Sequence, residues 1–409
     1  MISNSIFKST VLFFCLITIS CSQKIKSQNQ KTTTNTDKKE VVAEQVITDI
    51  RTGAQNLQFT PLLKNKKIGV VANASSISIN NTHLIDFLIK FNFDVKKIYA
   101  PEHGFRGTAD AGELIKDGKD TKTGLPIISL YGNNKKPKPE QLAGIDVMVF
   151  DLQDVGARFY TYISSLHYVM EACAENNIPL IVLDRPNPNG GIVDGPILEK
   201  EYTSFVGMHP IPVLHGMTIG EYAKMINGEK WLKNEVQCKL TVIPCLNYNR
   251  NMAYSLPVKP SPNLPNDQAI NLYASLCLFE GTNVSVGRGT DKQFQIYGSP
   301  FLPKSDFNFT PGPNVGAKDP MHNGKLCNGE DLSKINKVSR LELTWLIKAY
   351  QTTSDKSKFF NDFFTKLAGT KKLQQQIETG VSEAEIRKSW AKGIADFKSM
   401  RKSYLIYGE

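Results

Sequence analysis

Short apolar runs alternate with longer amphipathic segments through the first half of the chain. The apolar runs have the length of buried strands and lie at residues 68–73, 95–100, 125–131, 145–153 and 178–186. Segments with helical spacing of apolar residues lie at 80–92, 137–143 and 160–176. Near-continuous apolar strands separated by helices are typical of a parallel sheet covered on both faces. The pattern therefore predicts an α/β fold with a doubly wound parallel sheet.

The pattern changes after residue 230. A proline-rich loop lies at 257–265 and a loop of small residues at 281–291. Two amphipathic helical segments follow, at 340–351 and 356–368. We expect a smaller α/β domain here, so that residues 46–232 form a first domain and residues 233–409 a second. The stretch 370–402 is strongly charged, and we expect it to be a helix with a solvated face.

The first 45 residues have the layout of an export signal followed by a polar segment. A basic residue precedes the apolar run 11–19, and Cys21 follows a small residue at its end. This arrangement resembles a bacterial lipobox, with Thr18 in place of the usual leucine; cleavage without lipidation is the alternative. We expect a signal peptide at 1–20, then a lipidated Cys21 with a flexible tether to residue 45. We expect the protein to lie in the periplasm and to be anchored by its lipid to the outer membrane.

The formal charge of +10 is unevenly distributed. Residues 1–45 hold six lysines against three acidic residues, which leaves +7 for the rest of the chain. This excess suits an anionic substrate or an envelope surface, but no basic stripe of the kind that binds nucleic acid is present. Outside residues 11–19, no apolar run approaches the roughly 20 residues that a membrane helix needs. Nucleic-acid binding and a polytopic membrane protein are therefore disfavoured.

Several kinds of chemistry lack their usual sequence signals. The seven cysteines of the 409 residues are scattered, which predicts neither a zinc site nor a disulfide framework. No GxGxxG follows the first strand, and neither GxxxxGK[ST] nor GxSxG occurs. We therefore expect no metal, no nucleotide cofactor and no serine nucleophile on a strand-to-helix turn.

Polar side chains follow three of the predicted strands at their carboxyl ends. They are Glu102 and His103, Asp151 and Asp154, and Asp184 and Arg185. Ligands in open α/β sheets bind beyond the carboxyl ends of the strands, so we expect these groups to line one cleft. A loop cap is the alternative for each acid taken singly.

The acids at two of these strand ends are candidates for catalysis. Glu102 lies in PEHGFRG, where its carboxyl group can act as a general acid or can pair with Arg106. His103 has no partner at metal-ligand spacing, which favours an orienting hydrogen bond. Asp151 and Asp154 can act as base, nucleophile or acceptor of sugar hydroxyls, and Asp154 can instead cap the helical segment that follows.

Further side chains are candidates for substrate contacts. Tyr160 can stack on a sugar face, and Arg288 lies between glycines, where its guanidinium can meet a carboxylate bidentately. The remaining candidates, each with a loop-stabilising alternative, are Glu113, Arg158, Asp184 and Asn187.

Long motifs throughout the chain resemble the exo-β-N-acetylmuramidase (NamZ) family. They are PEHGFRG, DAGE, GIDVMVFDLQDVGARFYTYISSLHYVMEA, LDRPNPNGG, VDGPILE, SFVGMHPIPVLHGMTIGEYA, PSPNLPN and LFEGTNVSVGRGTD. The resemblance runs from about residue 48 to the C-terminus and weakens at 300–330 and in the last helices.

This resemblance implies a Rossmann-like N-terminal domain, a smaller C-terminal α/β domain and a cleft between them. Family members release N-acetylmuramic acid (MurNAc) from MurNAc-GlcNAc ends of peptidoglycan fragments, without metal or nucleotide. The family's proposed catalytic glutamate matches Glu102. Its other cleft positions carry over less firmly, onto His103, Arg106, Asp151, Asp154, Arg158 and Arg288.

We therefore predict a lipid-anchored periplasmic exo-muramidase for cell-wall turnover. Glu102 would protonate the leaving oxygen, and the second group would be Asp151, Asp154 or the acetamido group of the substrate. Arg158 or Arg288 would pair with the lactyl carboxylate that distinguishes MurNAc from GlcNAc. The rival hypotheses are a non-catalytic peptidoglycan-binding lipoprotein and an esterase or amidase acting on envelope polymers.

Overall fold

The structure is a computed structural model and describes residues 49–105 and 117–408. These residues belong to one compact unit. The predicted signal peptide, tether and lipidated Cys21 lie outside the described residues. In the part that is described, no helix has both the length and the apolar character that crossing a membrane requires.

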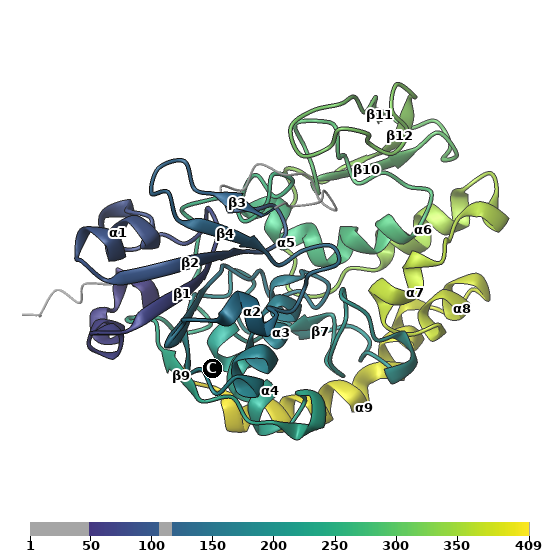
Figure 1. The fold of residues 1–409 in the computed structure, drawn as a ribbon. Coiled ribbons are helices and arrows are strands. Elements are labelled where there is room, and N and C mark those ends of the chain that lie inside the picture. Colours follow the sequence, from purple (N-terminus) through teal and green to yellow (C-terminus); the bar gives the residue numbers. More distant parts are fainter. Residues whose placement is uncertain (1–48, 106–116, 409) are drawn as a thin grey trace, which may run out of the picture. The chain divides into compact units, whose positions relative to one another are not determined.

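A sheet of seven strands, in the order β3-β4-β2-β1-β5-β6-β9, forms the N-terminal part (Figure 1). The strands are β1 (Lys67–Ala72), β2 (Asp94–Ala100), β3 (Gly118–Lys119), β4 (Pro126–Ser129), β5 (Val147–Asp151), β6 (Leu180–Leu183) and β9 (Leu240–Ile243). Neighbouring strands are parallel except β3 and β4. The predicted α/β fold with a parallel sheet is confirmed. Strand β9 lies beyond residue 232, so the sheet extends past the predicted end of the first domain.

Side chains of the central strands alternate between two cores. In β1, Ile68 and Val70 face a core with α1 (Leu84–Lys90). Val71 faces a larger core that includes α3 (Tyr162–Glu175) and α4 (Ile219–Gly228). Helices therefore cover both faces of the sheet, which explains why its strands are almost continuously apolar.

The predicted helices of this part occur with shifted ends. Helix α1 begins four residues later than the pattern indicates, because Asn80 and Asn81 have left-handed backbone conformations at φ 53° and 54°. Helix α2 is a single turn, Pro139–Leu142.

The 3-10 helices of the described residues are η1 (Gly53–Gln55), η2 (Leu57–Leu63), η3 (Ile79–Asn81), η4 (Lys200–Tyr202), η5 (Lys233–Glu235), η6 (Cys277–Gly281), η7 (Lys356–Lys358) and η8 (Lys402–Tyr404).

The C-terminal part combines helices with a small antiparallel sheet of order β10-β12-β11. Its elements are α5 (Asp267–Leu276), β10 (Ile296–Ser299), β11 (Phe307–Phe309), β12 (Cys327–Asp331), α6 (Thr344–Thr352), α7 (Phe363–Ala368), α8 (Lys372–Glu378) and α9 (Glu383–Arg401). Strands β7 (Val193–Asp194) and β8 (Leu214–His215) form a separate antiparallel pair. The charged stretch 370–402 is helical as predicted, but α9 also buries Ile386, Trp390 and Phe397 against the core.

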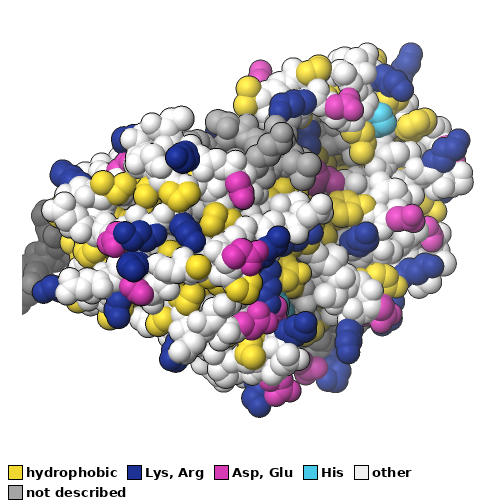
Figure 2. Space-filling model, in the orientation of Figure 1, with side chains coloured by type: hydrophobic (Ala, Val, Ile, Leu, Met, Phe, Trp, Pro, Cys, Tyr) yellow, Lys and Arg dark blue, Asp and Glu magenta, His cyan; other side chains and the backbone are white. Residues whose placement is uncertain are grey.

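The structure shows where the cysteines and the charged side chains of the described part lie. The five cysteines in the described part are all buried and free. On the face drawn in Figure 2, lysine and arginine side chains are interspersed with acidic ones and form no continuous basic stripe.

Candidate active site

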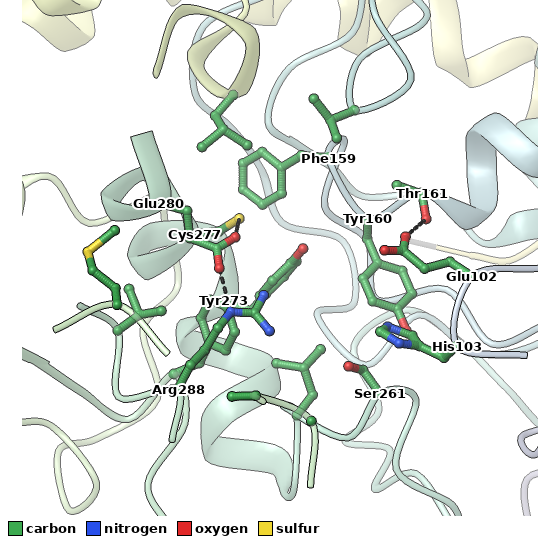
Figure 3. A pocket seen from close by; sticks show the side chains of 18 of the residues that line it. Glu102, His103, Phe159, Tyr160, Thr161, Ser261, Tyr273, Cys277, Glu280 and Arg288 are labelled. Atoms are coloured by element: carbon green, nitrogen blue, oxygen red, sulfur yellow. Dashed lines mark hydrogen bonds and ion pairs between the residues drawn. The ribbon is translucent and has the colours of Figure 1, made fainter. Parts of the chain in front are cut away.

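A cavity of about 630 Å³ opens at the carboxyl ends of the parallel strands, where the C-terminal part meets the sheet. Its walls come from the loop after β2, the segment 159–162 at the start of α3, the end of α5 with η6, and the loops 284–288 and 316–321. The size suits a ligand of one or two sugar rings. Figure 3 shows Glu102 and His103 on one side of this pocket, with Arg288 and Glu280 on the other.

Glu102 is directed into the pocket by a tight turn after β2. His103 and Gly104 adopt left-handed backbone conformations at φ 70° and 74°, which reverse the chain directly beside Glu102. The half-buried carboxylate accepts hydrogen bonds from the Thr161 hydroxyl at 2.7 Å and the Tyr131 hydroxyl at 3.0 Å. Each carboxylate oxygen thus has a donor among the described residues, which orients the group toward the cavity.

Two buried tyrosines lie behind the turn that carries Glu102, and the Tyr162 hydroxyl is 3.5 Å from the Glu102 carbonyl oxygen. The Tyr162 hydroxyl accepts a hydrogen bond from Asn73 Nδ2 at 2.7 Å, and the Tyr160 hydroxyl donates to the Pro260 carbonyl at 2.7 Å. The two rings pack edge to face at 4.8 Å. Burial raises the pKa of Tyr160 and of Tyr162, so both remain neutral. Tyr160 lines the pocket, as a residue for sugar contacts requires.

Arg288 and Glu280 form an ion pair in the opposite wall. Arg288 Nε lies 2.6 Å from Glu280 Oε1, and the guanidinium lies 5.0 Å from the centre of the Phe294 ring. Burial by itself lowers the pKa of Arg288, but the charge and hydrogen bond of Glu280 outweigh it and the pKa is raised. Glu280 accepts a hydrogen bond from Nε alone. The terminal nitrogens of Arg288 make no hydrogen bond to another described residue.

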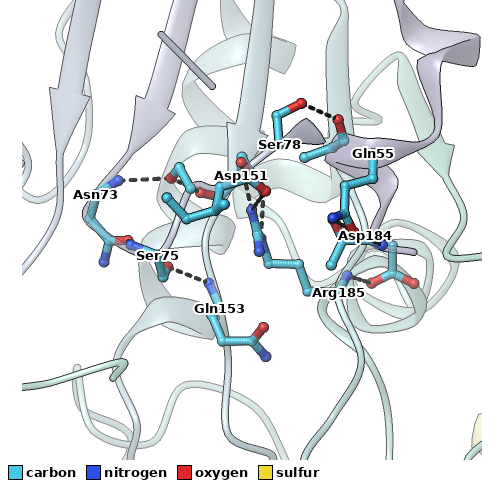
Figure 4. Close-up of polar contacts among 12 residues, drawn as sticks. Gln55, Asn73, Ser75, Ser78, Asp151, Gln153, Asp184 and Arg185 are labelled. Carbon is cyan, nitrogen blue, oxygen red and sulfur yellow. Dashed lines mark hydrogen bonds and ion pairs between the residues drawn. The ribbon is translucent and has the colours of Figure 1, made fainter. Parts of the chain in front are cut away.

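Asp151 and Asp154 are not among the described residues that line the pocket. Asp151 is fully buried and forms a two-point ion pair with Arg185, with distances of 2.6 and 2.9 Å (Figure 4). Asp154 is also buried and accepts a hydrogen bond from the Gly156 amide at 2.7 Å. These contacts match the loop-stabilising alternative more closely than direct catalysis.

Arg158 is a buried structural residue, and the structure does not bring it to the pocket. Its side chain is 0% exposed and donates to four backbone carbonyls, those of Pro196, Ile211, Leu367 and Ala368, at 2.7–2.9 Å. Burial lowers the pKa of Arg158 to about 9. Its two terminal nitrogens are therefore occupied in joining α7 to the loop before β8, and are not available to a substrate.

Two further predicted contacts also lie away from the pocket. Asp184 accepts hydrogen bonds from the Thr218 and Tyr407 hydroxyls, both at 2.7 Å, which fixes the start of α4 and the C-terminal segment. Asn187 is buried and donates to the Met217 carbonyl at 3.1 Å. Arg106 and Glu113 lie outside the described residues, so their predicted roles stay predictions.

The reasoning from sequence missed several pocket residues, among them Thr161, Glu280 and Tyr131. Thr161 and Glu280 lie within the motifs DVGARFYTY and LFEGTNVSVGRGTD, and Tyr131 ends an apolar run, but none has a distinctive spacing. Cys277 lies beside Glu280, and burial raises the pKa of its thiol far above the usual range, which makes it a poor nucleophile. Across residues 49–105 and 117–408, no cluster of histidine, cysteine and acidic side chains could hold a metal ion.

Comparison with known proteins covers nearly the whole described chain. The model of the N-terminal region of exo-β-N-acetylmuramidase NamZ matches residues 68–268, and the model of the C-terminal region matches residues 271–407. The peptidoglycan β-N-acetylmuramidase NamZ of Bacillus subtilis is 40% identical over 385 residues, which are 88% of this chain and 91% of that protein.

Two solved structures of DUF1343 family proteins from Bacteroides fragilis have the same fold. One is 45% identical with a TM-score of 0.81, and the other is 29% identical with a TM-score of 0.74. Each match covers 88% of this chain and 99% of the other. The chain belongs to the exo-β-N-acetylmuramidase NamZ family.

Proposed function

We propose that this protein is an exo-acting β-N-acetylmuramidase, a glycosidase that releases MurNAc from the non-reducing ends of peptidoglycan fragments. The observation that carries the proposal is the position of Glu102, held by two hydroxyl donors and directed into a pocket that has an arginine in its opposite wall. Family membership and the Bacillus subtilis relative support the same reaction. A peptidoglycan-derived saccharide is the corresponding substrate.

In the proposed reaction Glu102 protonates the glycosidic oxygen while the bond to the anomeric carbon breaks. The Thr161 and Tyr131 hydroxyls orient the carboxyl group, and both can rotate to accept as well as donate hydrogen bonds. The burial of Asp151 and Asp154 in other contacts favours attack on the anomeric carbon by the acetamido group of the substrate. Water then opens the cyclic intermediate, and Glu102 accepts its proton.

The test is digestion of the synthetic disaccharide MurNAc-GlcNAc, followed by mass spectrometry and proton NMR. We expect free MurNAc and free GlcNAc, with the β-anomer of MurNAc appearing first, because participation of the acetamido group retains configuration. Binding without any hydrolysis would favour a non-catalytic peptidoglycan-binding protein. Initial formation of the α-anomer would contradict assistance by the substrate but not the glycosidase activity.

Arg288 is our candidate for recognition of the lactyl group of MurNAc. Its Nε is occupied by Glu280, so the edge formed by its two terminal nitrogens is left for a carboxylate. The pKa of Arg288 is raised by Glu280, so the guanidinium is charged at neutral pH, where the lactyl group is ionised. Since GlcNAc lacks this carboxylate, the ion pair would provide the selectivity of the enzyme.

We further propose that the protein is anchored to the outer membrane by lipid on Cys21, with its folded part in the periplasm. The support is the order of a basic residue, an apolar run and a cysteine in the first 21 residues. Expression of the full chain with a radiolabelled fatty acid should label the wild type and leave Cys21→Ala unlabelled in the soluble periplasmic fraction. Equal labelling of both proteins would exclude Cys21 as the acceptor.

A further inference from the structure

Three half-buried aromatic rings and one lysine form a rim beside Glu102, which we call the aromatic rim: Tyr131, Tyr168, Phe205 and Lys135. Tyr131 and Phe205 line the pocket, with ring centres 6.4 Å apart. Phe205 also stacks on Tyr168 at 6.3 Å and 19°. The rim thus extends the pocket wall outward from α3 and from the loop that follows β4.

The rim begins at the catalytic carboxylate itself. The Tyr131 hydroxyl donates to Glu102 at 3.0 Å, and the ring of Tyr131 leads on to Phe205. If Glu102 protonates the glycosidic oxygen, as the proposed function states, the leaving sugar lies beyond Glu102 on this side. The apolar faces of a pyranose ring pack well on aromatic rings, which lose little conformational freedom on binding.

The lysine of the rim carries a charge that is not paired with any acid of the described residues. Lys135 Nζ lies 4.6 Å from the centre of the Phe205 ring and forms no ion pair with another described residue. The neighbouring Lys136 differs, because it binds Glu171 and Glu175, both at 2.6 Å. A cation that rests only on an aromatic face is free to bind an anionic group of a ligand instead.

We propose that the aromatic rim binds the part of the glycan that remains after cleavage. The GlcNAc ring next to the scissile bond packs on Phe205, and the free lactyl carboxylate of the following MurNAc pairs with Lys135. This inference rests on the proposed function and adds to it a preferred substrate, a glycan of at least three sugars, which the tetrasaccharide (MurNAc-GlcNAc)₂ satisfies. Disaccharides fill only part of the rim and are poorer substrates.

The test compares kcat/KM for β-MurNAc fluoride, the disaccharide MurNAc-GlcNAc and the tetrasaccharide (MurNAc-GlcNAc)₂. Phe205→Ala should lower kcat/KM about five- to tenfold for both saccharides and leave the fluoride, whose leaving group is one atom, within twofold. Lys135→Gln should lower it by about fivefold for the tetrasaccharide alone, an effect that disappears at high salt.

The chain provides a matched control pair away from the pocket. Lys90 Nζ lies 5.9 Å from the centre of the Phe91 ring, and Phe91 is 56% exposed. Phe91→Ala and Lys90→Gln should leave all three substrates unchanged. Equal losses on the fluoride and the saccharides in Phe205→Ala, or an unchanged ratio of tetrasaccharide to disaccharide in Lys135→Gln, would overturn the proposal.

A binding measurement keeps the proposal testable without turnover. In the Glu102→Gln background, calorimetry should show that the tetrasaccharide binds more tightly than the disaccharide and that Lys135→Gln removes this difference. If the wild-type protein hydrolyses nothing yet shows this binding pattern, the proposed function fails while the rim remains. If it hydrolyses all substrates with no dependence on Phe205 or Lys135, the rim fails while the function remains.

Discussion

Glu102→Gln should lower kcat/KM for the disaccharide MurNAc-GlcNAc by about 10²- to 10⁴-fold, the usual contribution of a general acid. The amide keeps the size of the side chain and can still bond the Thr161 and Tyr131 hydroxyls, but its N–H groups are not acidic enough to protonate the leaving oxygen. The loss should therefore appear in kcat rather than in KM. Steady-state release of MurNAc, measured on variants with matched thermal unfolding curves, provides the number.

The leaving group distinguishes loss of an acid from general damage to the site. A fluoride or nitrophenolate leaving group needs less protonation than a sugar alkoxide, so the defect of Glu102→Gln should shrink on β-MurNAc fluoride. The exposed Glu140 offers a control, since Glu140→Gln alters a carboxylate outside the pocket and should leave every rate unchanged. Retention of more than a tenth of the wild-type rate on the disaccharide would refute the acid assignment.

Replacing Arg288 should abolish the preference for MurNAc over GlcNAc. Loss of one partner of a hydrogen-bonded charge pair that bound substrate shields from water costs about 2–5 kcal/mol, so kcat/KM for a MurNAc glycoside should fall by about 30-fold or more. Arg288→Met would also leave the half-buried Glu280 without its cation, so the test uses the double variant Glu280→Gln/Arg288→Met. The matching GlcNAc glycoside has no lactyl carboxylate, and its weak hydrolysis should change less than threefold.

A lysine at this position tests the geometry of recognition. Arg288→Lys keeps the charge but loses the fork that can bond Glu280 and a carboxylate at the same time, so its kcat/KM should lie between the wild type and the double variant. Competition between the two glycosides gives the selectivity directly. Losses of equal size on MurNAc and GlcNAc substrates would assign Arg288 to the stability of the pocket wall and not to the lactyl group.

The sheet could be predicted because each strand carries its own signal. The segments that become β1, β5 and β6 are apolar on both faces, and this pattern follows directly from burial between two layers of helices. Strand β9 is half-exposed at the sheet edge, and its weaker apolar pattern explains why the predicted first domain ends before it. The start of α1 also differs from the prediction, because the asparagines before it have left-handed backbone conformations.

The candidate site was only partly predictable, because many polar residues after parallel strands fulfil structural roles. Glu102, Tyr160 and Arg288 line the pocket. Asp151, Asp184 and Arg158 also follow predicted strands in the sequence, yet the hydrogen bonds of each side chain are made to buried partners. A polar group at a strand end must find either a buried partner or a ligand, and local sequence does not distinguish these outcomes.

Sequence by itself determined the alternation of strands and helices, the place of Glu102 at a strand end, and the family resemblance. These depend on local periodicity and on contiguous motifs. Only the tertiary structure decided which polar groups face the pocket, because the partners come from distant segments. Arg158 donates to carbonyls 209 and 210 residues away, and the wall opposite Glu102 comes from residues 280 and 288. Contacts of this kind arise when the chain packs, and no local pattern specifies them.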